Sequence, residues 1–379
     1  MATEPSINPF LDGDSLIRSL NRARIVALHG VAVDAGVLGM TGYDLLSAAA
    51  LLRQIVAAAD RLRLELDTPD LIRRFDGCFD DPLALPHARA IAHDYGHRLG
   101  CLLLMLKRGE QANRAARPEW SDAHWNFWGG VRRIYLGGGL IGGRFGEYAV
   151  ETAQALLAEA RVTDLVVERA NYARHLVLFG LARAAPPTMA GSILFDFGQT
   201  SVKRGWAHYQ MGQLSRLSIW PDAPTVCTEV VASPEPEEEI RLRWQRMLDI
   251  IAASWAGIPS QQRPHTAIGI SLACYLFDGH PSPWDPGCYS SLQRLSPHLA
   301  TFVRAELGRR LGQTVEVALL HDGAAAAAVY AGNDRAVVIT LGTALGNGFP
   351  PAVDDLRPIA SDFEMQPSRG PQIVTDSDY

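Results

Sequence analysis

The segment SILFDFGQTSVKRGWA, residues 192–207, joins one apolar, strand-like run to a second through a short turn. The turn holds residue types suited to anion and metal chemistry, namely Asp196, Gly198, Gln199 and Thr200, and Lys203 lies just beyond it. Glycine lets backbone N–H groups converge on an anion because no Cβ stands in the way. The aspartate would repel a phosphate unless a metal ion stood between them. The pattern therefore indicates handling of Mg²⁺ and a nucleotide, and the alternative is an ordinary β-turn built on Asp and Gly.

Three other segments also place chemically useful residues where a strand ends. A triple glycine (Gly137, Gly138, Gly139) follows the strand-like RRIYL, and His321 and Asp322 separate VEVALL from an alanine-rich helix. The third segment, VVITLGTALGNGF (337–349), is a strand, a glycine turn and a strand, with candidate turn residues Gly342, Thr343 and Gly346.

Together these four segments resemble the two phosphate motifs, the adenosine motif and the catalytic-aspartate segment of the actin- and hexokinase-like ATPase superfamily. Within it, they are most similar to the ROK family of sugar kinases and repressors. The resemblance implies an α/β protein with two ribonuclease-H-like lobes that uses ATP and Mg²⁺. It also implies transfer of the γ-phosphate to a hydroxyl of a sugar, cyclitol or nucleoside, and family members often form homodimers.

The order of the motifs departs from the family. The adenosine-like segment (134–160) precedes the first phosphate-like segment (192–203), whereas the family has them in the opposite order. We therefore expect a circular permutation, with APPTMAGS (185–192) joining the family's usual ends. Chain ends that lie close together at a surface tolerate such rejoining. The expected lobes are 1–191 with 331–379, holding both chain ends, and 192–330.

The resemblance assigns roles to the motif residues. Asp196 would orient Mg²⁺, directly or through water, and Gly198, Gln199 and Thr200 would offer donors to phosphate. Lys203 would face phosphate; the alternative is a solvated strand lysine. The facing turn would contain Gly342, Thr343 and Gly346. The triple glycine would let the backbone approach adenosine at a helix N-terminus.

Asp322 is the expected general base, because phosphoryl transfer needs a group that accepts the proton of the acceptor hydroxyl. The alternative is an N-cap aspartate for the helix that follows. His321 stands where the family has Asn, which affects the expected substrate contacts. Glu364 matches a glutamate that the family places against its sugar, although Pro367 replaces the family's histidine and the Cys-rich zinc segment is missing.

Composition limits the other functions of this chain of 379 residues. Its net charge of −6 gives no reason to expect binding to nucleic acid or to anionic membranes. The five cysteines form no CxxC pair, so we expect neither a zinc knuckle nor a disulfide framework. The N-terminus lacks a signal-peptide core and no apolar run is long enough for a membrane span, so we expect a cytoplasmic protein. Trp120, Trp125 and Trp128 either pack in the interior or form a stacking wall for a ring.

The secondary-structure pattern predicts β-hairpins first and then alternating helices and strands in the second half of the chain. That order favours a mixed sheet with helices on its faces. The acids of SPEPEEE are expected in the first turn of a long helix, opposing its dipole. Helical periodicity is expected at 44–66, 86–106, 146–160, 175–185, 291–312 and 323–331, and strands at 192–198, 201–210, 213–220, 266–274, 314–320 and 335–342.

Two other classes of function compete with a kinase. One is a non-catalytic sugar sensor or repressor, against which the retained Asp322 and the lack of a basic helix-turn-helix argue. The other is an ATPase that drives a partner protein. Release of ADP with and without polyols distinguishes them, because an ATPase would not need the polyol.

Overall fold

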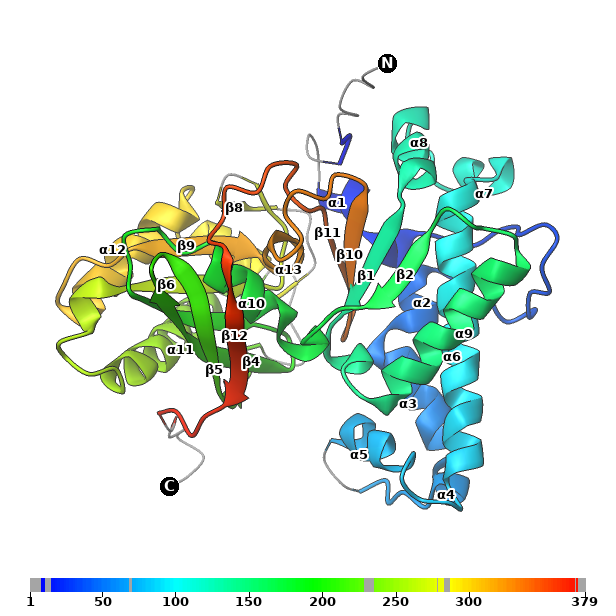
Figure 1. Ribbon diagram of the computed structural model, residues 1–379, viewed down its shortest axis with the longest axis horizontal. Coiled ribbons are helices and arrows are strands. Elements are labelled where there is room, and N and C mark those ends of the chain that lie inside the picture. The colour runs from blue at the N-terminus through cyan, green and yellow to red at the C-terminus, as the bar shows by residue number, and fades with distance from the viewer. Residues whose placement is uncertain are drawn as a thin grey trace. The chain divides into compact units, whose positions relative to one another are not determined.

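The chain divides into two compact units, each of them α/β with a mixed parallel and antiparallel sheet. Unit 1 contains Met1–Arg174 and Asp334–Phe349, and unit 2 contains His175–Asn333 and Pro350–Tyr379. The elements are labelled on the computed structural model in Figure 1. The structure describes residues 8–10, 15–67, 70–227, 235–277, 279–282, 287–371 and 373.

The sheet of unit 1 combines strands from distant parts of the sequence. Its order is β11-β10-β1-β2, in which β1 (Arg133–Gly137) lies parallel to both β10 (Ala336–Leu341) and β2 (Val166–Arg169). The hairpin of β10 with β11 (Leu345–Gly348) is antiparallel. Parallel pairing brings the carboxyl ends of β1 and β10 to the same edge of the sheet.

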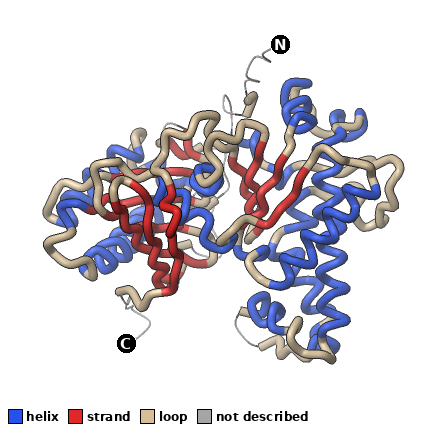
Figure 2. Tube along the Cα trace, viewed as in Figure 1, coloured by secondary structure: helices blue, strands red, loops and turns tan. Residues whose placement is uncertain are grey.

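Two long helices dominate unit 1, α6 (Leu85–Arg108) and α9 (Arg144–Glu159), and Figure 2 shows them in blue beside the short strands. The two helices approach so closely at Gly96 of α6 that a Cβ there would lie 2.3 Å from the carbonyl oxygen of Ala149, so this contact requires glycine. The helix α6 ends at Gly109, which adopts a φ of 49°. The other helical segments of unit 1 are α1 (Ser15–Arg18), η1 (Leu20–Arg22), α2 (Gly42–Leu46), α3 (Ala48–Ala57), α4 (Ala59–Leu62), α5 (Leu71–Gly77), α7 (Gln111–Ala115), α8 (Asp122–Gly130) and η2 (Gly139–Ile141), and η3 (Ala173–His175) ends at the boundary with unit 2.

The sheet of unit 2 has six strands in the order β12-β5-β4-β3-β6-β9. The strands β3, β4 and β5 form an antiparallel meander, and β6 and β9 continue the sheet parallel to β3. The edge strand β12 pairs in parallel with β5. Their bounds are β3 (Gly191–Phe197), β4 (Ser201–Gln210), β5 (Gln213–Pro224), β6 (Thr266–Leu272), β9 (Val317–His321) and β12 (Ile359–Pro367).

Alternation along β3 explains how the sheet of unit 2 is covered on both faces. All seven residues of β3 are buried, and Ile193, Phe195 and Phe197 belong to a core that includes α11 (Glu237–Ala256) and α12 (Leu299–Leu311). The other face packs against α10 (Leu176–Arg183), which contacts α13 (Asp322–Ala328). The smaller elements are η4 (Arg263–His265), η5 (Ser290–Arg294) and the two-residue strands β7 (Leu276–Phe277) and β8 (His280–Pro281).

Two predicted helices are shorter or broken in the structure. The predicted helix 44–66 is interrupted at Ser47, whose hydroxyl accepts a bond from the Ala50 N–H and caps α3, and again at Ala58. The predicted helix 291–312 begins only at Leu299. Glu237, Glu238 and Glu239 of SPEPEEE lie in the first turn of α11, as expected, whereas Glu235 precedes the helix and is ion-paired with Arg243. Ser233 and Pro234 fall outside the described residues.

The division into units differs from the expected lobes at three segments. Residues 175–191, 331–333 and 350–379 cluster with unit 2, whereas we expected them with 1–174. The cause is that β12 pairs with β5, and that Arg183 of α10 donates to the carbonyls of Ala328 at 2.8 Å and Val329 at 3.0 Å. Residues 1–7 and 374–379, which include the two chain ends, lie outside the described residues.

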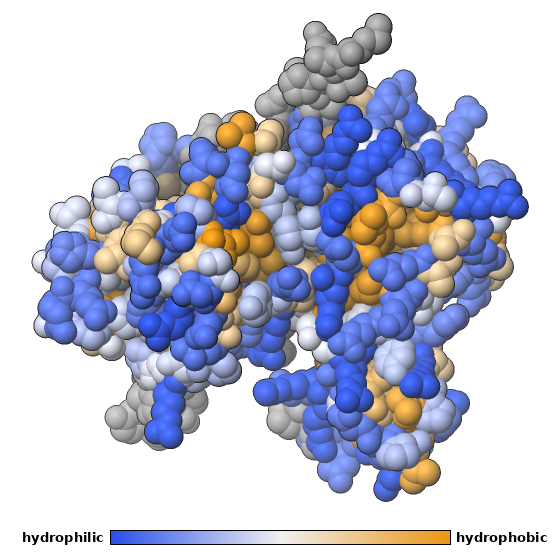
Figure 3. All heavy atoms as spheres, in the orientation of Figure 1, coloured by the Kyte–Doolittle hydropathy of each residue, from blue (hydrophilic) through white to orange (hydrophobic). Residues whose placement is uncertain are grey.

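The face drawn in Figure 3 is mostly hydrophilic, with apolar residues interspersed. In the described parts of the chain, no helix combines the length and apolar character needed to cross a membrane.

Candidate functional site

Asp196 lies near the carboxyl end of β3 and is held by its neighbours on both adjoining strands. Strand register places it opposite Lys203 of β4 and Ser271 of β6. The Lys203 Nζ donates to Asp196 Oδ2 at 2.8 Å, and the Ser271 Oγ donates to Oδ1 at 2.8 Å. Since the aspartate is only 3% exposed, the cation and the hydroxyl compensate its burial.

Lys203 is surrounded by carboxylates and is not a solvated strand residue, because its side chain is 21% exposed. Burial lowers the pKa of Lys203, but the carboxylates of Asp196, Asp222 and Asp322 outweigh burial and hold that pKa above its usual range. Asp222 also accepts a bond from the Ser201 hydroxyl at 3.2 Å. Three carboxylates therefore act on one ammonium, and Lys203 balances the charge of only one of them.

Asp322 lies where β9 ends and α13 begins, one residue past the strand that pairs with β6. The His321 Nε2 lies 2.8 Å from Asp322 Oδ1, and the Gly323 N–H donates to the same oxygen at 2.6 Å. Burial raises the pKa of Asp322, but His321, this N–H and Lys203 together bring it below its usual range. The carboxylate therefore stays ionised at neutral pH.

The N-cap alternative for Asp322 differs from the structure by one residue. His321 is the N-cap residue, without a side-chain capping bond, and Asp322 is the first residue of α13. The His321 ring stacks on the Tyr275 ring, with centroids 4.4 Å apart. His321 therefore lies between an aromatic ring and the carboxylate, and it can position Asp322.

The turn after β3 is more constrained than the sequence indicates. The Gly198 N–H donates to the Asp196 carbonyl at 3.0 Å and to the Ser201 carbonyl at 3.2 Å, so it is not a spare phosphate donor. Gln199 is partly exposed and Thr200 is exposed, so both are accessible.

The two glycine segments of unit 1 meet at one edge of its sheet. Gly138 adopts a φ of 96°, and a Cβ there would lie 2.3 Å from the Leu341 carbonyl oxygen, so only glycine permits this approach. Gly137 pairs with Thr340, which in turn pairs with Gly346. The structure thus brings together Gly137, Gly138, Gly139, Gly342, Thr343 and Gly346 at the ends of β1 and β10.

The expectation that the triple glycine lies at a helix N-terminus is wrong. Residues Gly139–Ile141 form the separate turn η2, and α9 begins at Arg144 with Gly143 as its N-cap. The Gly138 N–H is also engaged, since it donates to the Ala173 carbonyl at 2.8 Å.

Glu364 is not brought near Asp322. It lies on β12, is exposed, and pairs with Arg216 of β5. Continuing across the sheet, Arg216 pairs with His208 and His208 with Gly191, the first residue of β3. This row lies at the opposite end of β3 from Asp196, and the reason is the parallel register of β12, which the sequence does not indicate.

The tryptophans pack in the interior of unit 1, which was one of the two alternatives. Trp120, Trp125 and Trp128 are 4%, 2% and 1% exposed. Phe10 packs among them, with its ring centroid 5.3 Å from that of Trp120. These residues are therefore part of a core and offer no exposed stacking wall.

Sequence reasoning missed several residues around Asp196. Ser271 could have been suspected, because its hydroxyl lies at the end of the apolar strand 266–272. Nothing in the sequence indicates Asp222 and Tyr289, because only strand register and loop packing bring them close to Asp196. The pairing of Cys227 with Cys288 in a disulfide also contradicts the expectation of no disulfide. These two cysteines are separated by 61 residues, so their spacing gives no sign of the bond.

Within the described residues, no group of three or more His, Cys, Asp or Glu side chains is arranged to hold a metal ion. The first phosphate-like segment and Asp322 belong to unit 2, and the triple glycine and the second phosphate-like segment belong to unit 1. No family model matches the chain, and no curated protein matches it.

Proposed function

We propose that this protein is an ATP-dependent kinase that transfers the γ-phosphate to a hydroxyl of a sugar or a sugar-like small molecule. The observation that carries the proposal is the cluster at the carboxyl ends of β3, β6 and β9 in unit 2. There Asp196, Lys203 and Ser271 form one bonded row, and the carboxylates of Asp196 and Asp322 both act on the Lys203 ammonium. These groups supply what phosphoryl transfer requires, namely positive charge, an acceptor for a proton and carboxylates for a metal ion.

In this proposal Asp322 is the general base. Its Oδ1 is bonded to His321 and Gly323, so among the described residues Oδ2 is left to accept the proton of the acceptor hydroxyl. As that proton leaves, the hydroxyl oxygen bonds to the γ-phosphorus, the bond from this phosphorus to the bridging oxygen breaks, and ADP departs. His321 holds the carboxylate ionised and in place, and Lys203 offers its charge to the transferred phosphoryl group.

The carboxylates at this edge fit a magnesium ion. Mg²⁺ is usually held by one or two carboxylates, waters and substrate phosphates rather than by a cage of protein ligands. Asp196 and Asp222 would supply the carboxylates, and a bound Mg²⁺ would neutralise charge on the nucleotide phosphates. Location in the cytoplasm is part of the same proposal.

The finer fold is also part of the proposal. We infer ribonuclease-H-like lobes in a circularly permuted order, related to ROK sugar kinases. Support comes from unit 2, where a three-stranded meander is extended on its first strand by two parallel strands. Support also comes from unit 1, where strands from 133–137 and 336–341 pair although they are far apart in the chain.

The test is release of ADP from MgATP with and without a panel of sugars, cyclitols and nucleosides. The proposal predicts that one of these acceptors raises ADP release by orders of magnitude and becomes phosphorylated. Equal ADP release without any acceptor would instead indicate a partner-driving ATPase. Binding of a sugar with no turnover would indicate a sensor, and either result would overturn the kinase proposal.

A further inference from the structure

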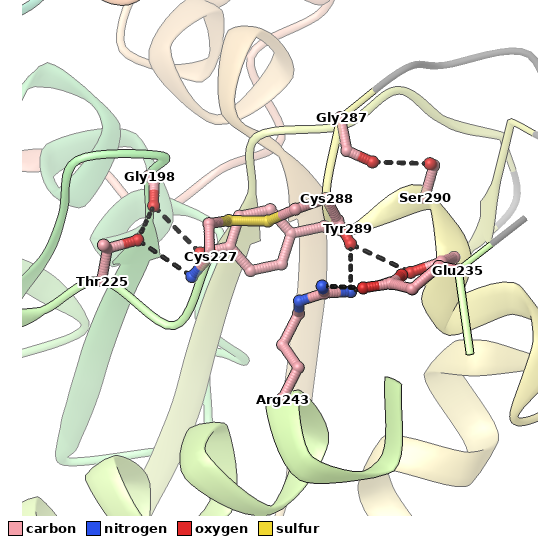
Figure 4. Close-up of a disulfide and its surroundings, with 10 residues drawn as sticks. Gly198, Thr225, Cys227, Glu235, Arg243, Gly287, Cys288, Tyr289 and Ser290 are labelled. Atoms are coloured by element: carbon pink, nitrogen blue, oxygen red, sulfur yellow. Dashed lines mark hydrogen bonds and ion pairs between the residues drawn. A yellow bond between two sulfur atoms is a disulfide. The ribbon is translucent and has the colours of Figure 1, made fainter. Parts of the chain in front are cut away.

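The Cys227–Cys288 disulfide lies beside the turn that follows β3, as Figure 4 shows. We infer that Thr225, Cys227, Cys288 and Tyr289 form a clamp on the Gly198 carbonyl, and that this clamp positions the turn for the nucleotide and is opened by dithiols. The inference rests on the proposed function, because it assigns the clamp a role in binding MgATP.

The clamp holds the Gly198 carbonyl from two segments of the chain. The Tyr289 hydroxyl donates to this oxygen at 2.9 Å and the Thr225 hydroxyl at 3.3 Å. Thr225 also accepts a bond from the Cys227 N–H at 3.2 Å. Each donor thus lies within two residues of a cysteine of the disulfide, which fixes the separation of the two donor segments.

The Cys288 side of the clamp is anchored to α11. The Cys288 carbonyl accepts a bond from Arg243 at 2.7 Å, and Arg243 is 2% exposed. Arg243 is itself ion-paired with Glu235, which is also buried. Tyr289 is fully buried in the same core, so its hydroxyl has a fixed position against Gly198.

Planarity of the peptide bond connects the clamp to the proposed phosphate contacts. The Gly198 carbonyl and the Gln199 N–H belong to one peptide group, in which they point in opposite directions. Two donors on the carbonyl therefore fix the direction of the Gln199 N–H. This N–H is one of the groups expected to meet a phosphate, whereas the Gly198 N–H is bonded inside the turn.

Opening the clamp is a two-electron reduction. One sulfur of the dithiol attacks the disulfide and the Sγ–Sγ bond breaks; its second sulfur then displaces the other cysteine, so the dithiol becomes a cyclic disulfide and its two protons pass to the two cysteine thiols. The other cysteines, Cys78, Cys101 and Cys274, are buried and already reduced. Thr225 would then be free to move relative to Tyr289, and the Gly198 peptide would lose a fixed orientation.

The experiment compares the protein before and after treatment with dithiothreitol, alongside Tyr289→Phe and a Cys227→Ala/Cys288→Ala double variant. Two quantities are measured, the hydrogen exchange of the amides of 198–201 and the Kd for MgATP. Tyr209→Phe is the matched control, because the Tyr209 hydroxyl donates to the Ala182 carbonyl at 2.7 Å and is likewise buried. Since one hydrogen bond contributes about 1 kcal/mol, we expect Tyr289→Phe to raise the Kd about fivefold.

We expect reduction and the double variant each to speed the amide exchange of 198–201 and to raise the Kd for MgATP. Dithiothreitol should change neither quantity further in the double variant. Unchanged exchange at 198–201 in both Tyr289→Phe and the reduced protein would overturn the clamp. MgATP binding with equal affinity in every form would overturn its role and leave the proposed function standing. Failure of the untreated protein to bind MgATP would overturn the proposed function and that role together, whereas the exchange result would still decide whether the turn is clamped.

Discussion

Each carboxylate oxygen of Asp196 has a different donor, and the two donors do different work. The Lys203 ammonium balances its charge, and the Ser271 hydroxyl of the neighbouring strand β6 donates to the other oxygen. Because Ser271 carries no charge, its substitution removes a hydrogen bond to Asp196 without changing the net charge of the cluster. It is therefore a positioning residue in the proposed reaction.

Ser271→Ala tests this role against a matched buried serine. The change leaves Asp196 Oδ1 without its donor, which costs about 1–3 kcal/mol of stability, and we expect kcat/KM to fall with it. Ser254→Ala is the control, because Ser254 is as buried as Ser271 and accepts a bond from Arg204 at 2.8 Å. Urea unfolding and turnover are measured for both. A similar loss of activity in the two variants would show that Ser271 acts only through stability.

The pKa of Asp322 predicts how its contribution to stability depends on pH. Its pKa in the folded protein lies below the ordinary value of 3.8. Between these two pKa values, the unfolded chain therefore binds more protons than the folded protein does. The stabilisation is fully present above pH 3.8 and is lost as pH falls through the folded value. We expect the difference in unfolding free energy between the protein and Asp322→Asn to be constant from about pH 6 to about pH 4.5 and to shrink below pH 3.8. Shrinkage that begins above pH 5 would contradict a lowered pKa.

At the scale of elements, the position of Asp322 depends on the contact between α10 and α13. A Cβ at Gly180 of α10 would lie 1.6 Å from the Ala325 carbonyl oxygen of α13. Arg183, also on α10, donates to the carbonyls of Ala328 at 2.8 Å and Val329 at 3.0 Å. The helix that begins with Asp322 is therefore fixed along its length by α10.

Gly180→Ala is expected to displace α13 and lower turnover more than MgATP affinity. Overpacking of this kind costs about 1–3 kcal/mol. Gly308→Ala on α12 is the control, because a Cβ there meets nothing nearer than the Gln313 carbonyl oxygen at 3.5 Å. That variant should keep full activity and gain up to about 1 kcal/mol. Thermal unfolding measures the stability of both variants, and kinetics measures their turnover and MgATP affinity. Full activity in Gly180→Ala would show that turnover does not depend on the placement of α13.

Elements with strong periodicity were predictable from the sequence, and those set by register were not. The helix expected at 86–106 is present as Leu85–Arg108, and the strand expected at 192–198 as Gly191–Phe197. The strand β12 was missed because most of its residues are exposed, so it has no apolar face to signal it. The same lack of local signal hides Asp222 and the disulfide, since their partners come from distant segments.

At the scale of the whole molecule, the chain has one lysine in each unit, so the reactivity of each lysine amine can be used to follow one unit. Lys107 of unit 1 has a side chain 8% exposed and pairs with Asp164, and Lys203 of unit 2 has a side chain 21% exposed. A small acylating reagent followed by mass spectrometry measures both reactivities in a single sample. Any change caused by a ligand can thus be assigned to a unit.

We expect MgATP to slow the acylation of Lys203 severalfold and to leave Lys107 unchanged. The physical reason is that a nucleotide phosphate near Lys203 shields the amine and favours its unreactive ammonium form. Equal rates at Lys203 with and without MgATP would place the nucleotide elsewhere and contradict the site. Comparable slowing at both lysines would point to a general change in the protein.

If Asp322 accepts a proton during phosphoryl transfer, the Asp322→Asn variant must transfer phosphate slowly. The amide preserves the shape of the side chain but cannot accept the hydroxyl proton. A positioned general base contributes roughly 10²- to 10⁴-fold to the rate. With the acceptor identified by the ADP-release panel, we expect kcat to fall by that factor while the Kd for MgATP is retained. Transfer by Asp322→Asn at the rate of the unsubstituted protein would show that Asp322 is not the general base.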